Sequence, residues 1–71
     1  MKLTKQQIIE QWGYWTNYIV IFNKDLSQEQ IYNTNRLLKA LSDQALYYYG
    51  ADFEASLKRP KYDSQKGYTW Q

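Results

Sequence analysis

Paired carboxylates are the first candidates for acid–base chemistry in this 71-residue chain, because it contains no histidine and no cysteine. Two carboxyl groups held close together can serve as general acid and general base. The closest acidic pair, Asp52 and Glu54, stands where a short helix is expected to begin, and helix capping accounts for acids at that place. The other acids are scattered and lack the spacing of a calcium loop. We therefore expect no enzyme, no metal site, no cofactor and no small-molecule substrate.

The C-terminal residues offer a second kind of chemistry, because cations alternate there with aromatic rings. Residues 58–71 hold four basic side chains against the single acid Asp63, whereas residues 1–57 are almost neutral. The basic residues are Lys58, Arg59, Lys61 and Lys66. Bases of a single-stranded nucleic acid stack on aromatic rings while cations follow its phosphates. A nucleic-acid contact is therefore one interpretation of this tail, although an excess of three positive charges is a small footprint for it.

Aromatic residues make up 18% of the chain, with eight tyrosines and three tryptophans. Two or three helices of this length can hardly enclose all of them together with the aliphatic side chains. Successive helical positions point about 100° apart, so the run Tyr47-Tyr48-Tyr49 cannot enter one core as a whole. Exposed tyrosines supply large, rigid contact areas for protein recognition. The residues that we expect at a protein interface are Tyr14, Tyr32, Tyr47, Tyr49, Tyr62, Tyr68 and Trp70.

Two copies of one phrase mark where the elements that position these residues begin. The phrase Leu-[Ser/Thr]-x-x-Gln-Ile occurs at 3–8 and again at 26–31. In each copy the hydroxyl of Thr4 or Ser27 can accept a hydrogen bond from the N–H three residues on, while the Gln there reaches back to the N–H of the capping residue. The flanking Leu and Ile have the spacing of a hydrophobic staple. Each copy therefore predicts the start of a helix.

Apolar residues after each start recur with the period of an amphipathic helix. The first stripe is Ile8, Trp12, Trp15, Ile19 and Phe22, and the second is Ile31, Thr34, Leu38, Leu41, Ala45 and Tyr48. These stripes predict helices over about 5–22 and 28–49, and the short connection between them predicts an antiparallel pair. We expect the stripes to form the core, with Trp15 and Leu38 buried against the opposite helix. A strand over 18–22 is the alternative, because that run is rich in strand-favouring residues.

After the second helix, the sequence predicts one more short helix and then an extended segment. Gly50 is expected to cap the second helix in a left-handed conformation. Asp52 can cap a third helix over about 53–58, and Pro60 ends it because the residue before a proline avoids the helical region. Residues 61–71 show no helical period and are expected to form an extended arm.

The predicted fold class is therefore all-α, an antiparallel helical hairpin with a short third helix. The domain division that follows is a helical domain, 1–60, and a C-terminal arm, 61–71, on which Tyr68 and Trp70 point to one side. The N-terminus is too polar for a signal peptide, and the longest apolar run is five residues where a membrane span needs about 20. We expect a soluble protein in the cytoplasm, with no membrane partner.

The function that we expect from the sequence is non-enzymatic protein–protein interaction. The chain would be a small accessory or inhibitor protein that docks an aromatic surface on a larger protein or on a second copy of itself. The alternative is a single-stranded nucleic-acid binder that uses the basic, aromatic tail. A third class is an assembly component whose arm reaches into a neighbouring subunit. Small proteins without cysteine and histidine are frequent among phage and mobile-element accessory genes, and if the chain is encoded by a phage, the cytoplasm in which we expect it is that of the host.

Overall fold

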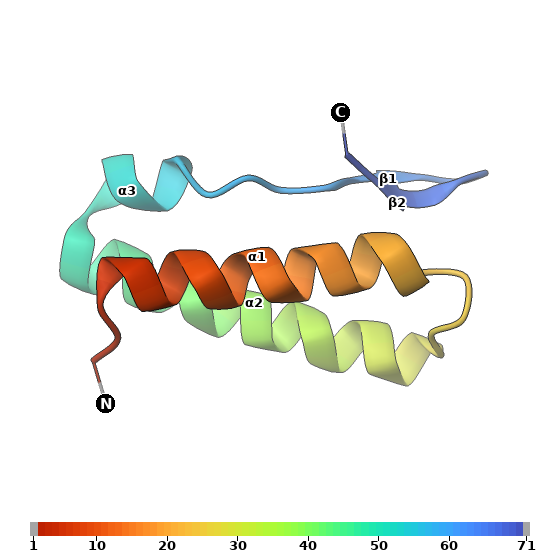
Figure 1. The fold of residues 1–71 in the computed structure, drawn as a ribbon, viewed down its shortest axis with the longest axis horizontal. Coiled ribbons are helices and arrows are strands. Elements are labelled where there is room, and N and C mark those ends of the chain that lie inside the picture. The colour runs from red at the N-terminus through yellow and green to blue at the C-terminus, as the bar shows by residue number, and fades with distance from the viewer. Residues whose placement is uncertain (1, 71) are drawn as a thin grey trace.

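The structure is a computed structural model that describes residues 2–70, and most of these residues are helical (Figure 1). Two long helices, α1 (Lys5–Phe22) and α2 (Gln28–Tyr49), form an antiparallel pair and are followed by a short helix, α3 (Ala51–Ala55). Two short strands complete the chain, β1 (Lys61–Asp63) and β2 (Gly67–Thr69). The predicted helical hairpin is confirmed, with the predicted boundaries for both long helices.

Both long helices begin with the capping box that the repeated phrase predicts. Thr4 Oγ1 accepts a hydrogen bond from the Gln7 N–H at 3.1 Å, and Gln7 Oε1 accepts one from the Thr4 N–H at 2.9 Å. Ser27 and Gln30 repeat this geometry at 3.1 and 2.9 Å. These bonds satisfy N–H groups that no helical carbonyl can reach, and so they fix where each helix starts.

The core lies between α1, α2 and the segment that follows α3. Its buried apolar residues are Ile8, Trp12, Ile19, Leu38, Leu41, Ala45 and Leu57. Thr16 and Thr34 are buried among them, and their hydroxyls donate to helical carbonyls at 2.7 and 2.8 Å. A hydroxyl that donates to the preceding turn of its own helix needs no further partner, and this makes threonine acceptable inside the core.

The two predicted stripes enter this core only in part. Leu38 is buried as expected, but Trp15 is half-buried and Phe22 is 46% exposed. On α2 it is Tyr49 that turns inward, and its hydroxyl donates to the Leu3 carbonyl oxygen at 2.6 Å, whereas Tyr48 stays exposed. One long side of the helix pair is therefore left open.

The alternative of a strand over 18–22 is wrong, because α1 continues through all five residues. Ile19 lies on the buried stripe of α1, and its burial favours the helix over the strand preference of its neighbours. The helix ends at a tight turn in which the N–H groups of Asp25 and Leu26 both donate to the Phe22 carbonyl, at 2.8 and 3.1 Å.

Helix α3 begins two residues earlier than predicted and ends three residues earlier. Gly50 has the expected positive φ of 94°, but its ψ of 169° is extended and not that of a left-handed cap. Its N–H donates to the Leu46 carbonyl and its carbonyl accepts from the Glu54 N–H, so Gly50 both ends α2 and begins α3. Asp52 lies inside α3 and is not its cap. The helix cannot continue to residue 58, because Leu57 leaves it to enter the core.

The extended arm predicted after residue 60 folds back on itself as an antiparallel hairpin. Lys61 pairs with Thr69, Tyr62 with Tyr68 and Asp63 with Gly67. The hairpin lies alongside the C-terminal half of α1 (Figure 1). The extended backbone was predicted, but the pairing of the two strands was not.

The hairpin turn and its attachment to α1 both depend on local side-chain chemistry. Asp63 Oδ1 accepts from the N–H groups of Gln65 and Lys66 at 2.7 and 3.1 Å, as is typical of aspartate in turns. Gly67 has a φ of 78°, and a Cβ there would collide with the side-chain amide of Asn23. Asn23 Nδ2 in turn donates to the Tyr68 carbonyl at 3.4 Å. The hairpin is thus held against the end of α1.

The folded chain is flat, with principal extents of 35 × 24 × 15 Å. None of the helices described has the length and apolar character needed to cross a membrane.

Candidate functional site

Glu54, one of the two acids that stand closest in the sequence, is engaged in contacts within the fold. Glu54 makes two contacts, since its Oε1 accepts from Ser42 Oγ at 2.9 Å and pairs with the guanidinium of Arg59. These contacts join α3 to α2 and to the segment after α3, so the role that the structure gives Glu54 is to hold elements together. Within residues 2–70 no three acidic side chains stand close enough to hold a metal ion.

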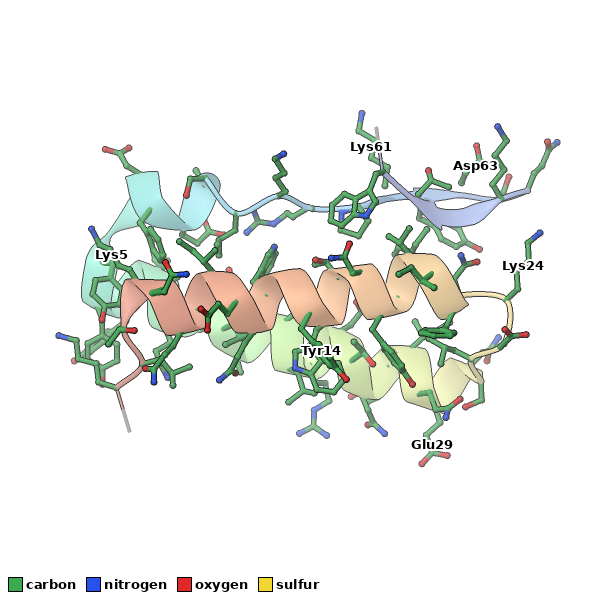
Figure 2. All side chains as sticks on the ribbon, in the orientation of Figure 1. Lys5, Tyr14, Lys24, Glu29, Lys61 and Asp63 are labelled. Atoms are coloured by element: carbon green, nitrogen blue, oxygen red, sulfur yellow. The ribbon has the colours of Figure 1, made fainter. Side chains whose placement is uncertain are left out.

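The four basic residues singled out in the tail have different surroundings. Arg59 is engaged on two sides, because it pairs with Glu54 and its guanidinium lies 5.1 Å from the centre of the Trp12 ring. Lys58, Lys61 and Lys66 are exposed. Figure 2 shows Lys61 pointing away from the helices. All four cations are therefore exposed, but Arg59 is also engaged within the chain.

Two of the three aromatic residues of the tail face α1. The Trp70 indole N–H donates to Asn17 Oδ1 at 3.1 Å, and Tyr68 packs against the core. Tyr62 is exposed and makes an edge contact with Tyr68, with ring centres 5.2 Å apart. Tyr68 and Trp70 lie on one side of the segment, as predicted, and that side is turned toward the protein.

The other tyrosines predicted at an interface lie on separate parts of the molecule. Tyr32 is exposed on α2 beneath Arg36, whose guanidinium is 5.9 Å from the ring centre. Tyr47 is 82% exposed near the end of α2, and Tyr49 is half-buried against the core. Tyr47 and Tyr49 belong to a row of rings that also includes Tyr48 and Phe53, at the end of α2 and in α3. Tyr14 is 64% exposed and belongs to a different row of four aromatic rings.

This aromatic row runs along α1. The ring centres of Tyr14 and Trp15 are 4.9 Å apart, those of Trp15 and Tyr18 are 5.6 Å apart, and those of Tyr18 and Phe22 are also 5.6 Å apart. The first two contacts are edge-to-face, the arrangement that aromatic quadrupoles favour. Figure 2 shows Tyr14 on the side of α1 away from Lys61 and Asp63.

Trp15 links this row to a shallow depression of about 210 Å³ along the seam between α1 and α2. We call the row and the depression together the open face. It consists of Leu3, Gln11, Tyr14, Trp15, Tyr18, Phe22, Leu37, Ala40, Leu41 and Gln44. None of these ten residues is charged. The sequence prediction included only Tyr14 among them, because Trp15 and Phe22 were assigned to the core; the spacing of 14, 15, 18 and 22 as a second stripe was the missed signal.

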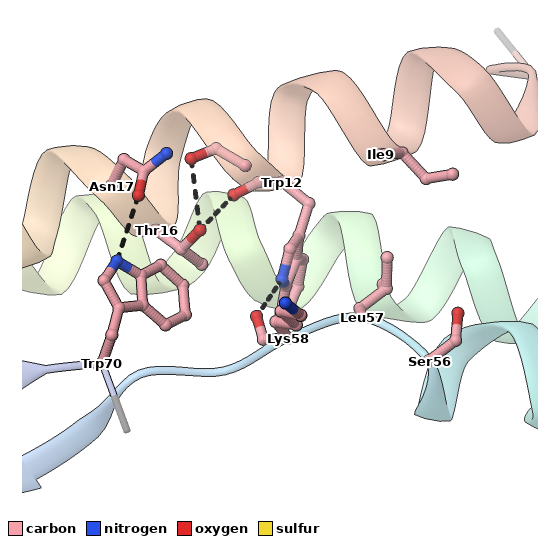
Figure 3. Close-up of a pocket in the computed structure, with 9 residues that line it drawn as sticks. Ile9, Trp12, Thr16, Asn17, Ser56, Leu57, Lys58 and Trp70 are labelled. Atoms are coloured by element: carbon pink, nitrogen blue, oxygen red, sulfur yellow. Dashed lines mark hydrogen bonds between the residues drawn. The ribbon is translucent and has the colours of Figure 1, made fainter.

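A second concave surface lies between α1 and the C-terminal segment, and we call it the groove (Figure 3). It has a volume of about 540 Å³ and is lined by Ile9, Trp12, Gly13, Thr16, Asn17, Ser56, Leu57, Lys58 and Trp70. The Trp12 indole N–H donates to the Lys58 carbonyl at 2.5 Å, which holds one indole in place, while Asn17 holds the other, Trp70. The residues of α1 that line the groove differ from those of the open face, so the two surfaces lie on different sides of that helix.

In comparisons with protein families, curated proteins and solved structures, no significant match to this chain was found. The functional argument therefore rests on these two surfaces.

Proposed function

We propose that this protein is a non-enzymatic protein–protein interaction module, that the open face is its interface, and that the surface it packs against is the open face of a second copy. The observation that carries the proposal is the composition of the open face: ten residues without a charge, four of them aromatic. The centres of protein interfaces are depleted in charged residues and enriched in Tyr, Trp and Phe. We further propose the cytoplasm as its location, since no cysteine is present that an oxidising compartment would pair.

A second copy is favoured because the open face can meet itself without repulsion. In a twofold dimer the same patch is used by both subunits, so a charge near the symmetry axis would face its own copy. The open face avoids this cost, and its Gln11 and Gln44 amides can each donate and accept.

The total exposed area supports the presence of an interface, whichever partner covers it. The chain has 5437 Å² of accessible surface, whereas a monomeric protein of its mass, 8.6 kDa, has about 4700 Å². The difference of about 700 Å² is close to the roughly 800 Å² that each partner contributes to an interface of standard size. One interface of standard size would therefore cover an area similar to this excess.

Single-stranded nucleic-acid binding ranks behind this proposal. A nucleic-acid site would need free cations and free aromatic rings, and one residue of each kind already has a partner within the chain. Arg59 is paired with Glu54, and Trp70 is hydrogen-bonded to Asn17. Docking on a larger, foreign protein stays open as the outcome if the chain proves monomeric.

The experiment is size-exclusion chromatography with light scattering over a range of protein concentrations. We expect the wild type to approach twice the chain mass, with little dependence on salt because the interface is uncharged. Tyr14→Arg and Leu37→Arg place like charges across the twofold axis and should give monomers with unchanged helical circular dichroism. Tyr47→Arg is the matched control, since Tyr47 is more exposed than either and lies outside the open face.

Two outcomes contradict the proposal. A wild type that stays monomeric at every concentration excludes the second copy as the occupant. A Tyr47→Arg variant that dissociates as readily as Tyr14→Arg means that the interface lies elsewhere.

A further inference from the structure

Gly13, on the floor of the groove, has no structural explanation. A glycine inside a helix costs about 1 kcal/mol relative to alanine. Gly13 has no positive φ, unlike Gly50 and Gly67, and a Cβ built on it would have no atom within 4 Å. Neither backbone geometry nor close packing therefore calls for a glycine in the middle of α1. Positions that break a local rule without a structural gain are where functional sites are expected.

A glycine at this position leaves room in the groove that a side chain would otherwise fill. The backbone of α1 is bare at the floor of the groove, so a bound group could touch it directly. Apolar side chains stand around that floor, with the Trp12 indole and Leu57 buried and Ile9 and Trp70 47% and 40% exposed. The walls therefore suit an apolar or aromatic group.

One of the nine residues that line the groove is charged, and it is basic. Lys58 is among its lining residues, and none of the nine is acidic. The two ion pairs found among the described residues join Lys39 to Asp43 and Arg59 to Glu54, so neither uses Lys58. An occupant that carries a negative charge beside its apolar group is the one that complements this surface.

Because the groove is open to solvent, it suits a protein ligand better than a small molecule. A pocket that binds a small molecule tightly buries most of the ligand, commonly about 70–90% of its surface. The groove leaves Ile9 and Trp70 half-exposed on its walls and would leave one side of any occupant in solvent. This arrangement fits a side chain whose other side belongs to a larger body.

From these observations we propose that the groove binds a segment of a partner protein through an aromatic side chain flanked by acidic residues. The aromatic ring lies on the bare backbone at Gly13, between the indole of Trp70 and the apolar wall, and the acidic residue lies near Lys58. The inference rests on the proposed function only in that the ligand is a protein. The groove and the open face are separate surfaces, so each can fail alone.

The test uses the ¹⁵N-labelled full chain and the blocked tripeptide acetyl-Asp-Phe-Asp-amide as the probe, followed by nuclear magnetic resonance. The backbone amide of Gly13 and the indole N–H of Trp70 report on the groove, and the indole N–H of Trp15 reports on the open face. We expect saturable shifts at Gly13 and Trp70 with little change at Trp15. Acetyl-Asp-Ala-Asp-amide should bind at least about tenfold more weakly, and acetyl-Lys-Phe-Lys-amide about two- to fivefold more weakly.

Gly13→Ala is the decisive variant, because the new methyl group fills the floor without a clash. We expect it to melt at a temperature at least as high as the wild type and yet to bind the probe at least about tenfold more weakly. Unfolding therefore cannot explain the loss. Lys58→Gln should weaken binding about two- to fivefold at low salt and reduce its salt dependence. Neither variant should change the oligomeric state.

Several results would overturn the inference. One is the absence of saturable shifts at Gly13 and Trp70, and another is equal binding of the Phe and Ala probes. A Gly13→Ala variant that binds like the wild type would also exclude it. If a short oligothymidine shifts Gly13 and Trp70 while the peptide does not, the groove is a nucleic-acid contact and the protein ligand is wrong. If the protein is a dimer and the probe causes no shifts in the groove, the proposed function is retained and only this inference is rejected.

Discussion

Adding one methyl group at Gly67, by substitution with alanine, should detach the C-terminal hairpin from α1. The φ of 78° at Gly67 is in a region that costs an L-residue about 1–2 kcal/mol. A Cβ there would also collide with the Asn23 side chain, so either Asn23 or the hairpin must move. Overpacking of this kind adds about 1–3 kcal/mol. We therefore expect Gly67→Ala to weaken the attachment of the hairpin by about 2–5 kcal/mol.

A penalty of this size should release the hairpin and leave the helix pair folded. Two strands alone are marginal in water, whereas α1 and α2 keep their own buried core. The assay is native-state amide hydrogen exchange. Gly67→Ala should remove the protection of the amides in β1 and β2 and keep that of the Leu38 amide in α2.

Two matched variants test the reasoning. Lys66→Ala changes the exposed neighbouring residue and should leave exchange in the hairpin unchanged. Asn23→Ala in the Gly67→Ala protein removes the collision, but neither the unfavourable φ nor the need for a link to α1, since it also removes the hydrogen bond from Asn23 to the Tyr68 carbonyl. It should restore part of the protection, because that bond is long, at 3.4 Å, and weaker than the collision. Unchanged exchange in Gly67→Ala itself would refute the argument, because neither the glycine conformation nor the contact with Asn23 would then hold the hairpin.

Two further changes probe the elements on which the surfaces are built. Ser27→Ala removes the acceptor of the Gln30 N–H and should cost about 1 kcal/mol, or about 4–8 °C in thermal melting for a domain of this size; an unchanged melting temperature would mean that the cap does not stabilise α2. Trp12→Phe deprives the Lys58 carbonyl of its indole donor and should lower the free energy of unfolding in urea by about 1–3 kcal/mol, more than Trp15→Phe, whose indole donates to none of the residues described. Equal losses for the two tryptophan variants would contradict a structural role for this hydrogen bond.

The parts of the fold that were predictable are those determined by residues that lie close together in the sequence. Thr4 with Gln7, and Ser27 with Gln30, act over three residues, so each helix start could be read from the sequence itself. The period of the apolar residues then gave the lengths of α1 and α2. The position of the hairpin depends instead on the close approach of Gly67 to Asn23, which is 44 positions away. No local sequence pattern predicts that contact.

The candidate surfaces were predictable only in part, for a similar reason. Which residues of an apolar helical stripe are buried depends on what other part of the chain packs over them. Here the C-terminal segment covers one side of the helix pair. Trp12 is therefore buried while Trp15 is half-buried, although they belong to one predicted stripe. The place of Gly13 in the groove depends on residues more than 40 positions later, so the sequence of α1 alone does not reveal it.

The main chain of Leu3 is bound on both sides by the far end of α2. Its N–H donates to Gln44 Oε1 at 2.8 Å, and its carbonyl accepts from the Tyr49 hydroxyl at 2.6 Å. The ends of helices normally fray, because their last turns lack partners. Here the residue before the cap of α1 is bonded to the last two turns of α2, so fraying at either end breaks at least one of these bonds. Amide protons at these two ends should therefore exchange at similar rates, and Tyr49→Phe should accelerate both together.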